Sequence, residues 1–528
     1  MHKIPTELLD AQGALTPEAV IGVVGAGAMG AGITQVAAAY GHQVLLYDAA
    51  EGAAQQGIDK TAQGLSKLVA KGKLSQADAD QLCGRIQAVN TLADFAPVDL
   101  VIEAIVENLE IKQKVFAELE SLCRPHTLLT SNTSSISITS IAAPLAQPQR
   151  FAGLHFFNPA PIMKLVEVIS GLATAPEVAQ CLYATAKAWG KQSVYASSTP
   201  GFIVNRVARP FYAESLRLLE EGAASVATLD ALMRDAGGFR MGPFELMDLI
   251  GHDVNYAVTS SVFSAYYQDP RFKPSLIQKA LVEGGRLGRK SGQGFYAYTE
   301  TAGALVHAQA KQAVNYATAA PAPSEILLEG NLGPAQALIT RSQAAGIPMH
   351  QRANAGRTQD GLLRIGDACV ALTDGRMASE RAVVEGISQL VVLDLALDYA
   401  KTTHLAIAAA DSTSETAVTQ VVGWLQALGI QVSVMEDTPA LVVMRTLAML
   451  ANEAADAVLQ GVCNPQDADI AMQNGVNYPR GPLAWAQEVG LARIYQVLAH
   501  LQASYAEDRY RPALLLRRKA YSGGVFYE

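Results

Sequence analysis

The sequence predicts an α/β domain followed by an all-α domain, after which a second, degenerate α/β segment precedes a second all-α copy. Three observations carry this prediction. Segments typical of strands and of helices alternate over the first third of the chain. Residues 199–297 have a mostly helical pattern, and this helical segment recurs near the C-terminus at a constant offset of 239 residues. Strands that alternate with helices predict a parallel sheet covered by helices on both faces.

Short apolar runs mark the expected strands of the first α/β domain. They occupy residues 19–24, 44–47, 99–105, 127–131, 151–157 and 165–169. A helical stretch that ends at Tyr40 and is stopped by Gly41 separates the first two runs. Residues 50–90 predict two charged helices joined at residues 71–73, an insertion longer than an ordinary crossover between parallel strands.

The internal repeat sets the organisation of the rest of the chain. Thr199-Pro200 aligns with Thr438-Pro439, and the register then holds without a gap. So long a match predicts two copies of one helical domain. The matched pairs are Val204/Val443, Arg206/Arg445, Glu214/Glu453, Gly222/Gly461, Asp230/Asp469, Gly242-Pro243/Gly481-Pro482 and Gly251/Gly490.

The repeat and the composition predict four domains and one linker. We expect an α/β domain at 1–198 with a helical arm at about 50–90, and a helical domain at 199–298. An Ala- and Pro-rich linker at 299–324 is expected to lead to a second α/β domain at 325–436, and the second helical copy to occupy 437–528. The strands of the second α/β domain are expected within 325–330, 367–374, 404–411 and 431–437.

Composition excludes several classes of protein. Half of the 528 residues are apolar and 17% are charged, which is typical of globular domains. The net charge of −9 argues weakly against a nucleic-acid partner, and no apolar run is long enough for a membrane span. Five scattered cysteines without a CxxC pair predict neither disulfides nor a metal site, and they favour a reducing, cytoplasmic location.

A glycine-rich turn follows the first expected strand. Gly25, Gly27 and Gly30 permit a tight turn, a close approach of a pyrophosphate to the backbone, and close packing of helix on strand. Asp48 ends the second strand, 21 residues after Gly27, where a carboxylate binds a ribose 2′-hydroxyl and repels a 2′-phosphate. The pattern predicts a Rossmann-type domain that binds NAD rather than NADP. The alternative is a glycine-rich turn without a nucleotide.

A histidine and a glutamate form the second candidate cluster. His155 and Glu167 lie on strand-like runs that flank Pro159-Ala160-Pro161. If these runs form an antiparallel hairpin centred on residue 161, the two side chains face each other. A carboxylate beside an imidazole holds one tautomer and stabilises the protonated ring, as a general base requires. The pattern leaves a second interpretation open, a buried histidine satisfied by a backbone carbonyl.

Residues 19–297 resemble the 3-hydroxyacyl-CoA dehydrogenase family over their whole length. The matching stretches occur in family order and spacing, so the resemblance is specific. They are GVVGAGAMGAGI, EAIVEN at 103–108, SNTSSISI at 131–138, RFAGLHFFNPAPIMKLVEVI, TPGFIVNR at 199–206 and GPFELMDLIG at 242–251. The resemblance implies NAD-dependent oxidation of (3S)-3-hydroxyacyl-CoA to 3-oxoacyl-CoA.

The same resemblance implies roles for individual residues. It makes His155 the general base, Glu167 its orienting partner, and Ser134 and Asn205 the hydrogen-bond donors to the reacting oxygen. Residues expected to contact the nicotinamide half of NAD are Glu107, Lys112 and Asn132. The insertion at 50–90 resembles the helical arm that grips CoA in this family, so that Lys60, Lys67 and Lys71 are expected to meet phosphates. A solvated charged helix face is the alternative for each of these lysines.

The whole chain resembles the long tandem bacterial form of this family, similar to the 3-hydroxybutyryl-CoA and 3-hydroxyadipyl-CoA dehydrogenases of phenylacetate degradation. Met444 stands where the repeat places Asn205, and residues 325–436 lack nucleotide-binding glycines. We therefore expect an acyl-CoA partner at one active site and a homo-oligomer in which the second helical copy acts as an internal dimer partner. Two other functions stay open at this point: a dehydrogenase of free β-hydroxy acids, and a non-catalytic NAD-binding protein.

Overall fold

The computed structural model describes residues 4–301, 304–307, 314–353 and 361–528. It separates into two compact units that do not follow the order of the chain. The N-terminal unit comprises Met1–Arg206 together with Gln460–Val476. The C-terminal unit comprises Val207–Leu459 together with Asn477–Glu528. Each unit is described by itself below.

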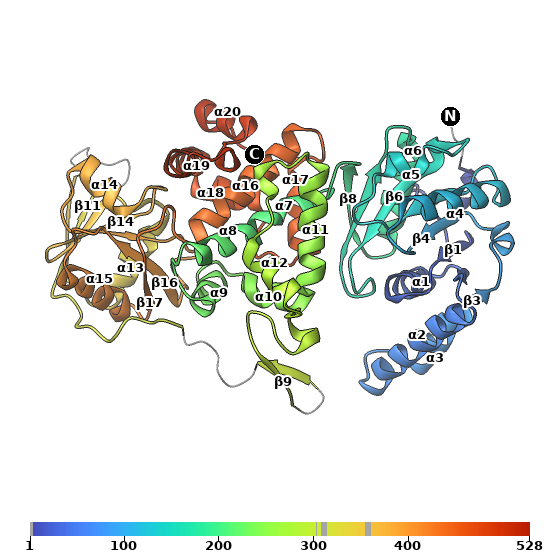
Figure 1. The fold of residues 1–528 in the computed structure, drawn as a ribbon, viewed down its shortest axis with the longest axis horizontal. Helices are drawn as coiled ribbons and strands as arrows, with labels where there is room; N and C mark the ends of the chain where they lie inside the picture. Colours follow the sequence, from blue (N-terminus) through green and yellow to red (C-terminus); the bar gives the residue numbers. More distant parts are fainter. Residues whose placement is uncertain (1–3, 302–303, 308–313, 354–360) are drawn as a thin grey trace. The chain divides into compact units, whose positions relative to one another are not determined.

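An eight-stranded sheet forms the centre of the N-terminal unit (Figure 1), in the order β3-β2-β1-β4-β5-β6-β7-β8. All neighbouring strands are parallel except β6 and β7, which form the expected antiparallel pair. The strand order reverses between β1 and β4, and ligands bind at such switch points in open α/β sheets. The strands are β1 (Ile21–Val24), β2 (Val44–Tyr47), β3 (Ile86–Val89), β4 (Leu100–Glu103), β5 (Leu128–Ser131), β6 (Phe151–Phe156), β7 (Leu165–Ser170) and β8 (Gln192–Ser197).

The helices of this unit connect the strands. They are α1 (Ala28–Tyr40), α2 (Ala53–Ala70), α3 (Gln76–Gly84), α4 (Leu109–Leu122), α5 (Ile138–Ala142), α6 (Pro176–Ala188) and the short α7 (Val204–Val207), where the first unit ends. Helices α2 and α3 pack against each other and form an arm (Figure 1) joined at residues 71–75, which confirms the helical pair expected there. The end of that segment differs from the expectation, because residues 86–89 form the edge strand β3 rather than a helix.

The second helical copy contributes one helix to the N-terminal unit. Helix α17 (Pro465–Gly475) packs on β7 and β8. The N–H of Tyr195 donates to the Asp467 carboxylate at 3.2 Å, and the N–H of Ser197 donates to the Val462 carbonyl at 2.8 Å. A helix from the far end of the chain therefore packs on the sheet that carries His155.

A seven-stranded sheet and two sets of helices form the C-terminal unit. The strand order is β12-β11-β13-β14-β15-β16-β17. The strands are β11 (Ile326–Glu329), β12 (Met349–Arg352), β13 (Leu362–Ile365), β14 (Ala368–Leu372), β15 (Leu390–Leu393), β16 (His404–Ala409) and β17 (Gln431–Met435). Helices α13 (Ala337–Ala344), α14 (Ala378–Glu385) and α15 (Glu415–Ala427) accompany them. This sheet confirms the degenerate α/β domain.

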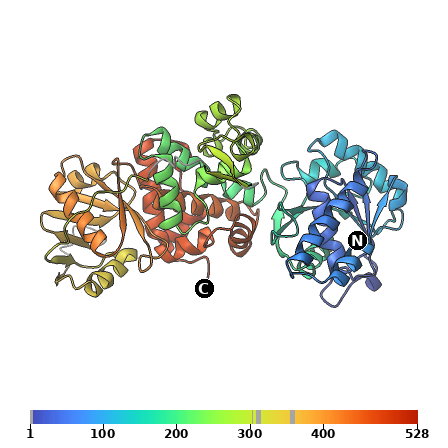
Figure 2. The ribbon, with the colours of Figure 1, turned by 90° about the horizontal axis from the view of Figure 1, so that it is seen from below.

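The two helical copies make up the rest of this unit. The first contains α8 (Arg209–Glu220), α9 (Val226–Asp235), α10 (Pro243–Ile250), α11 (His252–Ala265) and α12 (Leu276–Glu283). The second contains α16 (Val443–Leu459), α18 (Pro482–Val489), α19 (Leu491–Tyr505) and α20 (Leu514–Ser522). Helix α8, in green, lies beside the orange-red α16 in both views (Figures 1 and 2).

The repeat extends further back along the chain than the helical domain. Strand β16 and helix α15 begin and end 239 residues after β7 and α6. A contact repeats as well, because Glu436 donates its N–H to the Ala223 carbonyl at 3.4 Å, as Ser197 does to Val462. Residues 436 and 223 stand 239 after 197 and 239 before 462. Each copy therefore places its own helical segment against the sheet of the other.

The expected linker at 299–324 is structured in part. Strands β9 (Tyr298–Thr301) and β10 (Ala304–His307) form an antiparallel pair at its start, with four residues of each strand in register. Residues 302–303 and 308–313 of the expected linker lie outside the described residues. The linker stays a prediction, and its residues 299–301 and 304–307 lie in short strands.

A buried histidine should make the stability of the N-terminal unit depend on pH. The Nδ1 atom of His42 is 2.9 Å from the Ala19 carbonyl, and Trp189 Nε1 donates to His42 Nε2 at 3.0 Å. This pattern requires the neutral ring. Burial lowers the pKa of His42 to about 4, and weaker opposing effects of Ala19, Glu18 and Asp99 do not restore it. Because the pKa of the folded state lies below that of the unfolded state, stability is complete above pH 6.5 and is lost as the pH falls toward 4.

We expect His42→Gln to reduce this loss, since glutamine can keep both hydrogen bonds without titrating. Between pH 7 and pH 4 the unmodified protein should lose about 3 kcal/mol more free energy of unfolding than the variant. Urea unfolding followed by tryptophan fluorescence at both pH values measures the difference. Parallel pH dependences in the two proteins would contradict the neutral, doubly bonded ring.

Candidate active site

The glycine-rich turn lies between β1 and α1, at the switch point of the sheet. Gly25 has φ of 104°, and a Cβ there would be 2.5 Å from the Ala104 carbonyl oxygen. A Cβ at Gly30 would be 1.7 Å from the carbonyl oxygen of Gly25. Both positions therefore require glycine. Gly27 is different, because a Cβ there would meet no atom within 4 Å, and the backbone on this side of the turn stays open to a ligand.

The residues around this turn fit NAD. Helix α1 begins after Gly27 without a side-chain cap, so its first N–H groups are available for phosphate oxygens. Asp48 accepts hydrogen bonds from the N–H groups of Ala26 at 2.7 Å and Ala50 at 2.9 Å, one on each carboxylate oxygen. Each of these oxygens retains a second lone pair for a ribose hydroxyl. Asp48 thus fastens the turn and also presents an acceptor at its edge.

His155 and Glu167 face each other across β6 and β7, as the hairpin prediction requires. They are paired in the register of the two strands, and His155 Nδ1 lies 2.7 Å from Glu167 Oε2. His155 is 6% exposed and Glu167 is fully buried. Nδ1–H donates to the carboxylate, which leaves Nε2 as the basic nitrogen. The alternative of a histidine satisfied by a backbone carbonyl does not describe this contact.

Glu167 also holds the start of helix α7. Its Oε1 atom accepts hydrogen bonds from the backbone N–H of Ile203 at 3.0 Å and of Val204 at 3.1 Å. The next residue along the chain is Asn205. One buried carboxylate therefore fixes the imidazole of His155 through one oxygen and the backbone that carries Asn205 through the other.

A loop after β5 brings Ser134 to Asn205. The Asn205 Nδ2 atom donates to the Ser134 carbonyl at 3.4 Å. Glu107 Oε1 holds the loop by accepting from the backbone N–H of Ser134 at 3.0 Å and of Ser135 at 3.1 Å, and from the Thr133 hydroxyl at 2.6 Å. The structure thus connects Ser134, Asn205 and Glu167, and Glu107 lies in direct contact with this group.

A buried ionic network supports the same loop from below. Lys112 is 1% exposed and lies 2.7 Å from Glu103 and 3.3 Å from Glu107. Glu103 also accepts from the Ser131 hydroxyl at 2.6 Å. Burial alone would raise the pKa of Glu107, but hydrogen bonds from Thr133 and the charge of Lys112 outweigh it and hold that pKa below its ordinary value. Glu103 belongs to the EAIVEN motif, yet no role was predicted for it.

Asn132 ties the loop after β5 to the histidine strand. Its Oδ1 atom accepts from the backbone N–H of Phe156 at 2.7 Å. The amide nitrogen of Asn132 retains its two donor hydrogens, which suit a carboxamide or a hydroxyl of a ligand. Phe156 directly follows His155, so the Asn132 hydrogen bond positions the end of β6.

The lysines of the arm lie on its exposed surface. Lys60 and Lys67 are on α2, seven residues apart and so on one face of the helix, and Lys71 follows its last turn. All three side chains are exposed. This placement leaves them accessible to a phosphate and equally consistent with a solvated helix face.

The second α/β domain lacks the His155–Glu167 pair. Asp394 occupies the repeat position of His155, and Ala406 occupies that of Glu167, both at the offset of 239. The Asp394 N–H donates to the Ala406 carbonyl at 3.0 Å, so the two positions remain neighbours across the strands. The identity-based repeat, which begins at Thr199, did not reveal this substitution.

Asp394 keeps only the capping part of the Glu167 role. Its carboxylate accepts from the N–H groups of Val442 at 3.1 Å, Val443 at 2.8 Å and Met444 at 3.1 Å. Val442 and Val443 stand at the repeat positions of Ile203 and Val204, and Met444 at that of Asn205. Burial raises the pKa of Asp394 to about 6, although these backbone N–H groups oppose it. The second copy therefore holds its helix with an acid but lacks the imidazole and the amide.

Comparison with known proteins agrees with this geometry. The chain is 45% identical to the 3-hydroxyadipyl-CoA dehydrogenase of Escherichia coli K12 over 500 residues, which cover 95% of this chain and 97% of that protein. This chain belongs to the 3-hydroxyacyl-CoA dehydrogenase family. Residues 20–199 match the model of its NAD binding domain, and residues 201–298 and 441–525 both match that of its C-terminal domain. Residues 370–439 match the 3-hydroxybutyryl-CoA dehydrogenase reduced Rossmann-fold domain.

Other relatives match about half of this chain or nearly all of it. The mitochondrial hydroxyacyl-coenzyme A dehydrogenase of Sus scrofa is 42% identical over 52% of this chain and 90% of its own length. The crystal structure of 3-hydroxybutyryl-CoA dehydrogenase from Escherichia coli K12 has a TM-score of 0.85 and 44% identity, and covers 96% of this chain and 100% of that one.

Family membership establishes the activity class. The chain is an NAD-dependent 3-hydroxyacyl-CoA dehydrogenase, an oxidoreductase that acts on CH–OH groups. Among the residues that the structure describes, no helix combines the length and the apolar character needed to cross a membrane.

Proposed function

We propose that the enzyme oxidises (3S)-3-hydroxyacyl-CoA, with 3-hydroxyadipyl-CoA or 3-hydroxybutyryl-CoA as substrate, at one active site per chain. The observation that carries this proposal is the double role of Glu167. It orients the His155 imidazole through Oε2 and fixes the start of the Asn205 helix through Oε1. A base and a hydrogen-bond donor to the reacting oxygen are thereby held by one rigid, buried group.

The chemistry assigned to these residues is a proton removal coupled to a hydride loss. His155 Nε2 takes the proton of the substrate 3-hydroxyl, and the imidazolium that forms is stabilised by the Glu167 carboxylate. NAD, when bound, accepts the hydride that leaves C3. The Ser134 hydroxyl and the Asn205 amide donate hydrogen bonds to the oxygen as it becomes a carbonyl.

Binding roles are proposed for the remaining predicted residues. Glu107, Lys112 and Asn132 position the nicotinamide half of NAD, directly or by holding the loop after β5. The exposed lysines of the arm, Lys60 and Lys67 together with Lys71, bind CoA phosphates. A solvent-exposed ammonium binds a phosphate as a point charge, so each of these lysines contributes to affinity and little to orientation.

We further propose that the second helical copy is an internal dimer partner rather than a second enzyme. Two observations support this. Contacts between the copies are reciprocal, as the pairs Ser197–Val462 and Glu436–Ala223 illustrate, and reciprocal contacts are the mark of a two-fold interface. The loss of the imidazole at Asp394 leaves the second copy without a base.

We also propose a cytoplasmic location, because the five cysteines are all free.

A substrate and cofactor panel tests the proposed function. NADH consumption at 340 nm should be measured with acetoacetyl-CoA, 3-oxoadipyl-CoA and free acetoacetate, each with NADH and with NADPH. We expect turnover of the CoA esters with NADH, at least tenfold weaker use of NADPH because of Asp48, and no turnover of the free acid. Activity on the free acid alone, or NAD binding without turnover, would overturn the proposal.

A further inference from the structure

A cavity of about 120 Å³ opens beside helix α8 in the C-terminal unit. Its walls come from α8, from the segment 271–276 and from α12, with Thr259 of α11 and Arg509 completing them. The apolar part of the lining includes Leu216, Phe272 and Leu276. The polar part contains one acid, Glu220, which accepts a hydrogen bond from the Ser275 hydroxyl at 2.7 Å, and a larger number of cations, Arg209 among them. A single water needs at least ~10–15 Å³, so the cavity has room for a short carbon chain with a polar end.

Arg209 is a buried cation without a carboxylate partner in this cavity. The side chain is 5% exposed. Its Nη1 atom donates to the Thr259 hydroxyl at 3.0 Å, and its guanidinium lies 4.9 Å from the centre of the Tyr212 ring. Its Nε atom has no hydrogen-bond partner among the described residues. Burial accordingly lowers the pKa of this guanidinium, and only the nearby Tyr212 and Tyr478 oppose it.

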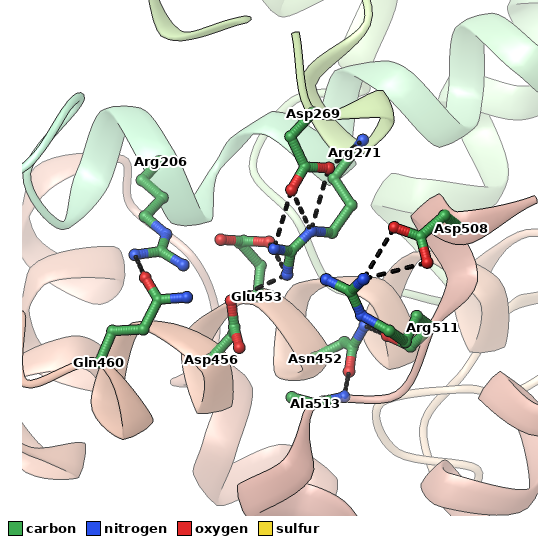
Figure 3. A network of polar contacts seen from close by, with 10 residues as sticks. All are labelled: Arg206, Asp269, Arg271, Asn452, Glu453, Asp456, Gln460, Asp508, Arg511 and Ala513. Carbon is green, nitrogen blue, oxygen red and sulfur yellow. Dashed lines mark hydrogen bonds and ion pairs between the residues drawn. The ribbon is translucent and has the colours of Figure 1, made fainter. Parts of the chain in front are cut away.

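A neighbouring arginine of the same cavity is neutralised. Figure 3 shows Arg271 between Asp269, Glu453 and Asp456, at distances of 3.1, 3.5 and 2.9 Å. Removing a charge from water is costly unless a counter-charge is supplied, and Arg271 has three. Arg209 has none within the part of the chain that the structure describes, so a ligand would have to provide it.

We propose that Arg209 and this cavity form a carboxylate-binding site. A guanidinium presents two parallel N–H donors that match a carboxylate. The apolar walls suit the methylene groups of an aliphatic chain, whereas inorganic phosphate would leave them in contact with a strongly hydrated anion. The ligand class is therefore an aliphatic carboxylate, either the distal carboxylate of a dicarboxylyl-CoA substrate or a free carboxylate.

The first of these sources rests on the proposed function. Arg209 follows Asn205 by only four residues in the sequence. Asn205 is the proposed donor to the oxygen on C3. In a six-carbon dicarboxylyl chain the distal carboxyl is three carbons beyond C3. A cationic residue that follows Asn205 closely in the sequence is therefore a candidate for binding this carboxyl group.

Two variants and one control test the site. Arg209→Met removes the charge and retains much of the stem, while Arg209→Lys keeps the charge but loses the planar pair of donors. We measure kcat/KM for 3-oxoadipyl-CoA and acetoacetyl-CoA, and calorimetric binding of free adipate. For Arg209→Met, the adipyl-to-butyryl ratio of kcat/KM should fall about 10- to 100-fold, the usual effect of a hydrogen bond to a charged group. Arg209→Lys should lie between.

The arms of the experiment separate the two sources. If Arg209→Met lowers the adipyl-to-butyryl ratio of kcat/KM, the site binds the substrate carboxylate. If the ratio is unchanged but Arg209→Met abolishes adipate binding, the site binds a free carboxylate. Arg511→Met, which alters an exposed arginine, should change neither. An unchanged ratio in both Arg209 variants, together with no adipate binding to the unmodified enzyme, would overturn the site. Failure of the proposed function is distinct, because no CoA ester would then be turned over while adipate binding could still be measured.

Discussion

Replacing His155 with glutamine should lower kcat by about 10²–10⁴-fold and leave NAD binding intact. Glutamine fills most of the imidazole volume but cannot accept a proton at neutral pH. The glycine turn follows β1 and Asp48 follows β2, whereas His155 lies on β6, so the substitution does not alter the cofactor site directly. Steady-state rates at saturating acyl-CoA give kcat, and calorimetric titration with NADH gives the affinity.

The Glu167→Gln variant separates the two functions of Glu167, which orients His155 and holds the start of helix α7. An amide oxygen can still accept from the N–H groups of Ile203 and Val204, so the helix start should be retained. The imidazolium, however, loses its charge partner, and the pH profile of kcat should shift to show it. A near-normal kcat for His155→Gln would remove the general base from this account, whatever the behaviour of Glu167→Gln.

The central strands of the N-terminal sheet were predictable because they are buried on both faces. Strands β1, β2 and β4 to β7 are apolar runs that differ from the expected ranges by at most two residues at either end, as buried parallel strands read in sequence. Strands β3 and β8 are the two edge strands of that sheet and contain exposed residues, and β12 has the polar sequence MHQR. Edge strands lack the apolar signal that marks the centre of a sheet, so sequence reasoning missed them.

The candidate site was predictable where local rules apply. The period of two along a strand places His155 opposite Glu167 once the turn at residue 161 is assumed, and the measured register agrees. The glycine spacing similarly predicts the turn between β1 and α1. The bond from Glu167 to Ile203 and Val204 was out of reach, because it joins a strand to a backbone segment 36 or 37 residues away.

Contacts between segments far apart in the sequence could not be predicted. Helix α17 begins 268 residues after the end of β8, so only the fold reveals that it packs on β7 and β8. Asp394 was missed for another reason. Across the sheet the repeat preserves shape and offset but few identities, and the positions of His155 and Glu167 have changed to Asp394 and Ala406.

The interface between the two helical copies should be the most sensitive part of the C-terminal unit. Arg445 in α16 is fully buried and lies 2.8 Å from Glu214 and 3.0 Å from Glu221, both in the first copy. Tyr505 and Tyr510 complete its hydrogen bonds at 2.9 and 2.8 Å. The N-terminal unit repeats part of this arrangement, because Arg206, at the repeat position of Arg445, donates to Gln460 at 2.9 Å.

We expect Arg445→Met to lower the free energy of unfolding by about 3–5 kcal/mol, because Glu214 would be left as an unpaired buried charge. Arg511→Met is the matched control: Arg511 pairs with Asp508 at 2.8 Å (Figure 3), but both side chains are about half exposed, so the cost should be at most ~1 kcal/mol. Adding Glu214→Gln to Arg445→Met should recover part of the loss, since the unpaired charge is then removed. Urea unfolding of the full chain compares the four proteins. Equal stability of Arg445→Met and Arg511→Met would contradict the internal dimer partner, since the arginine joining the copies would then contribute no more than a surface pair.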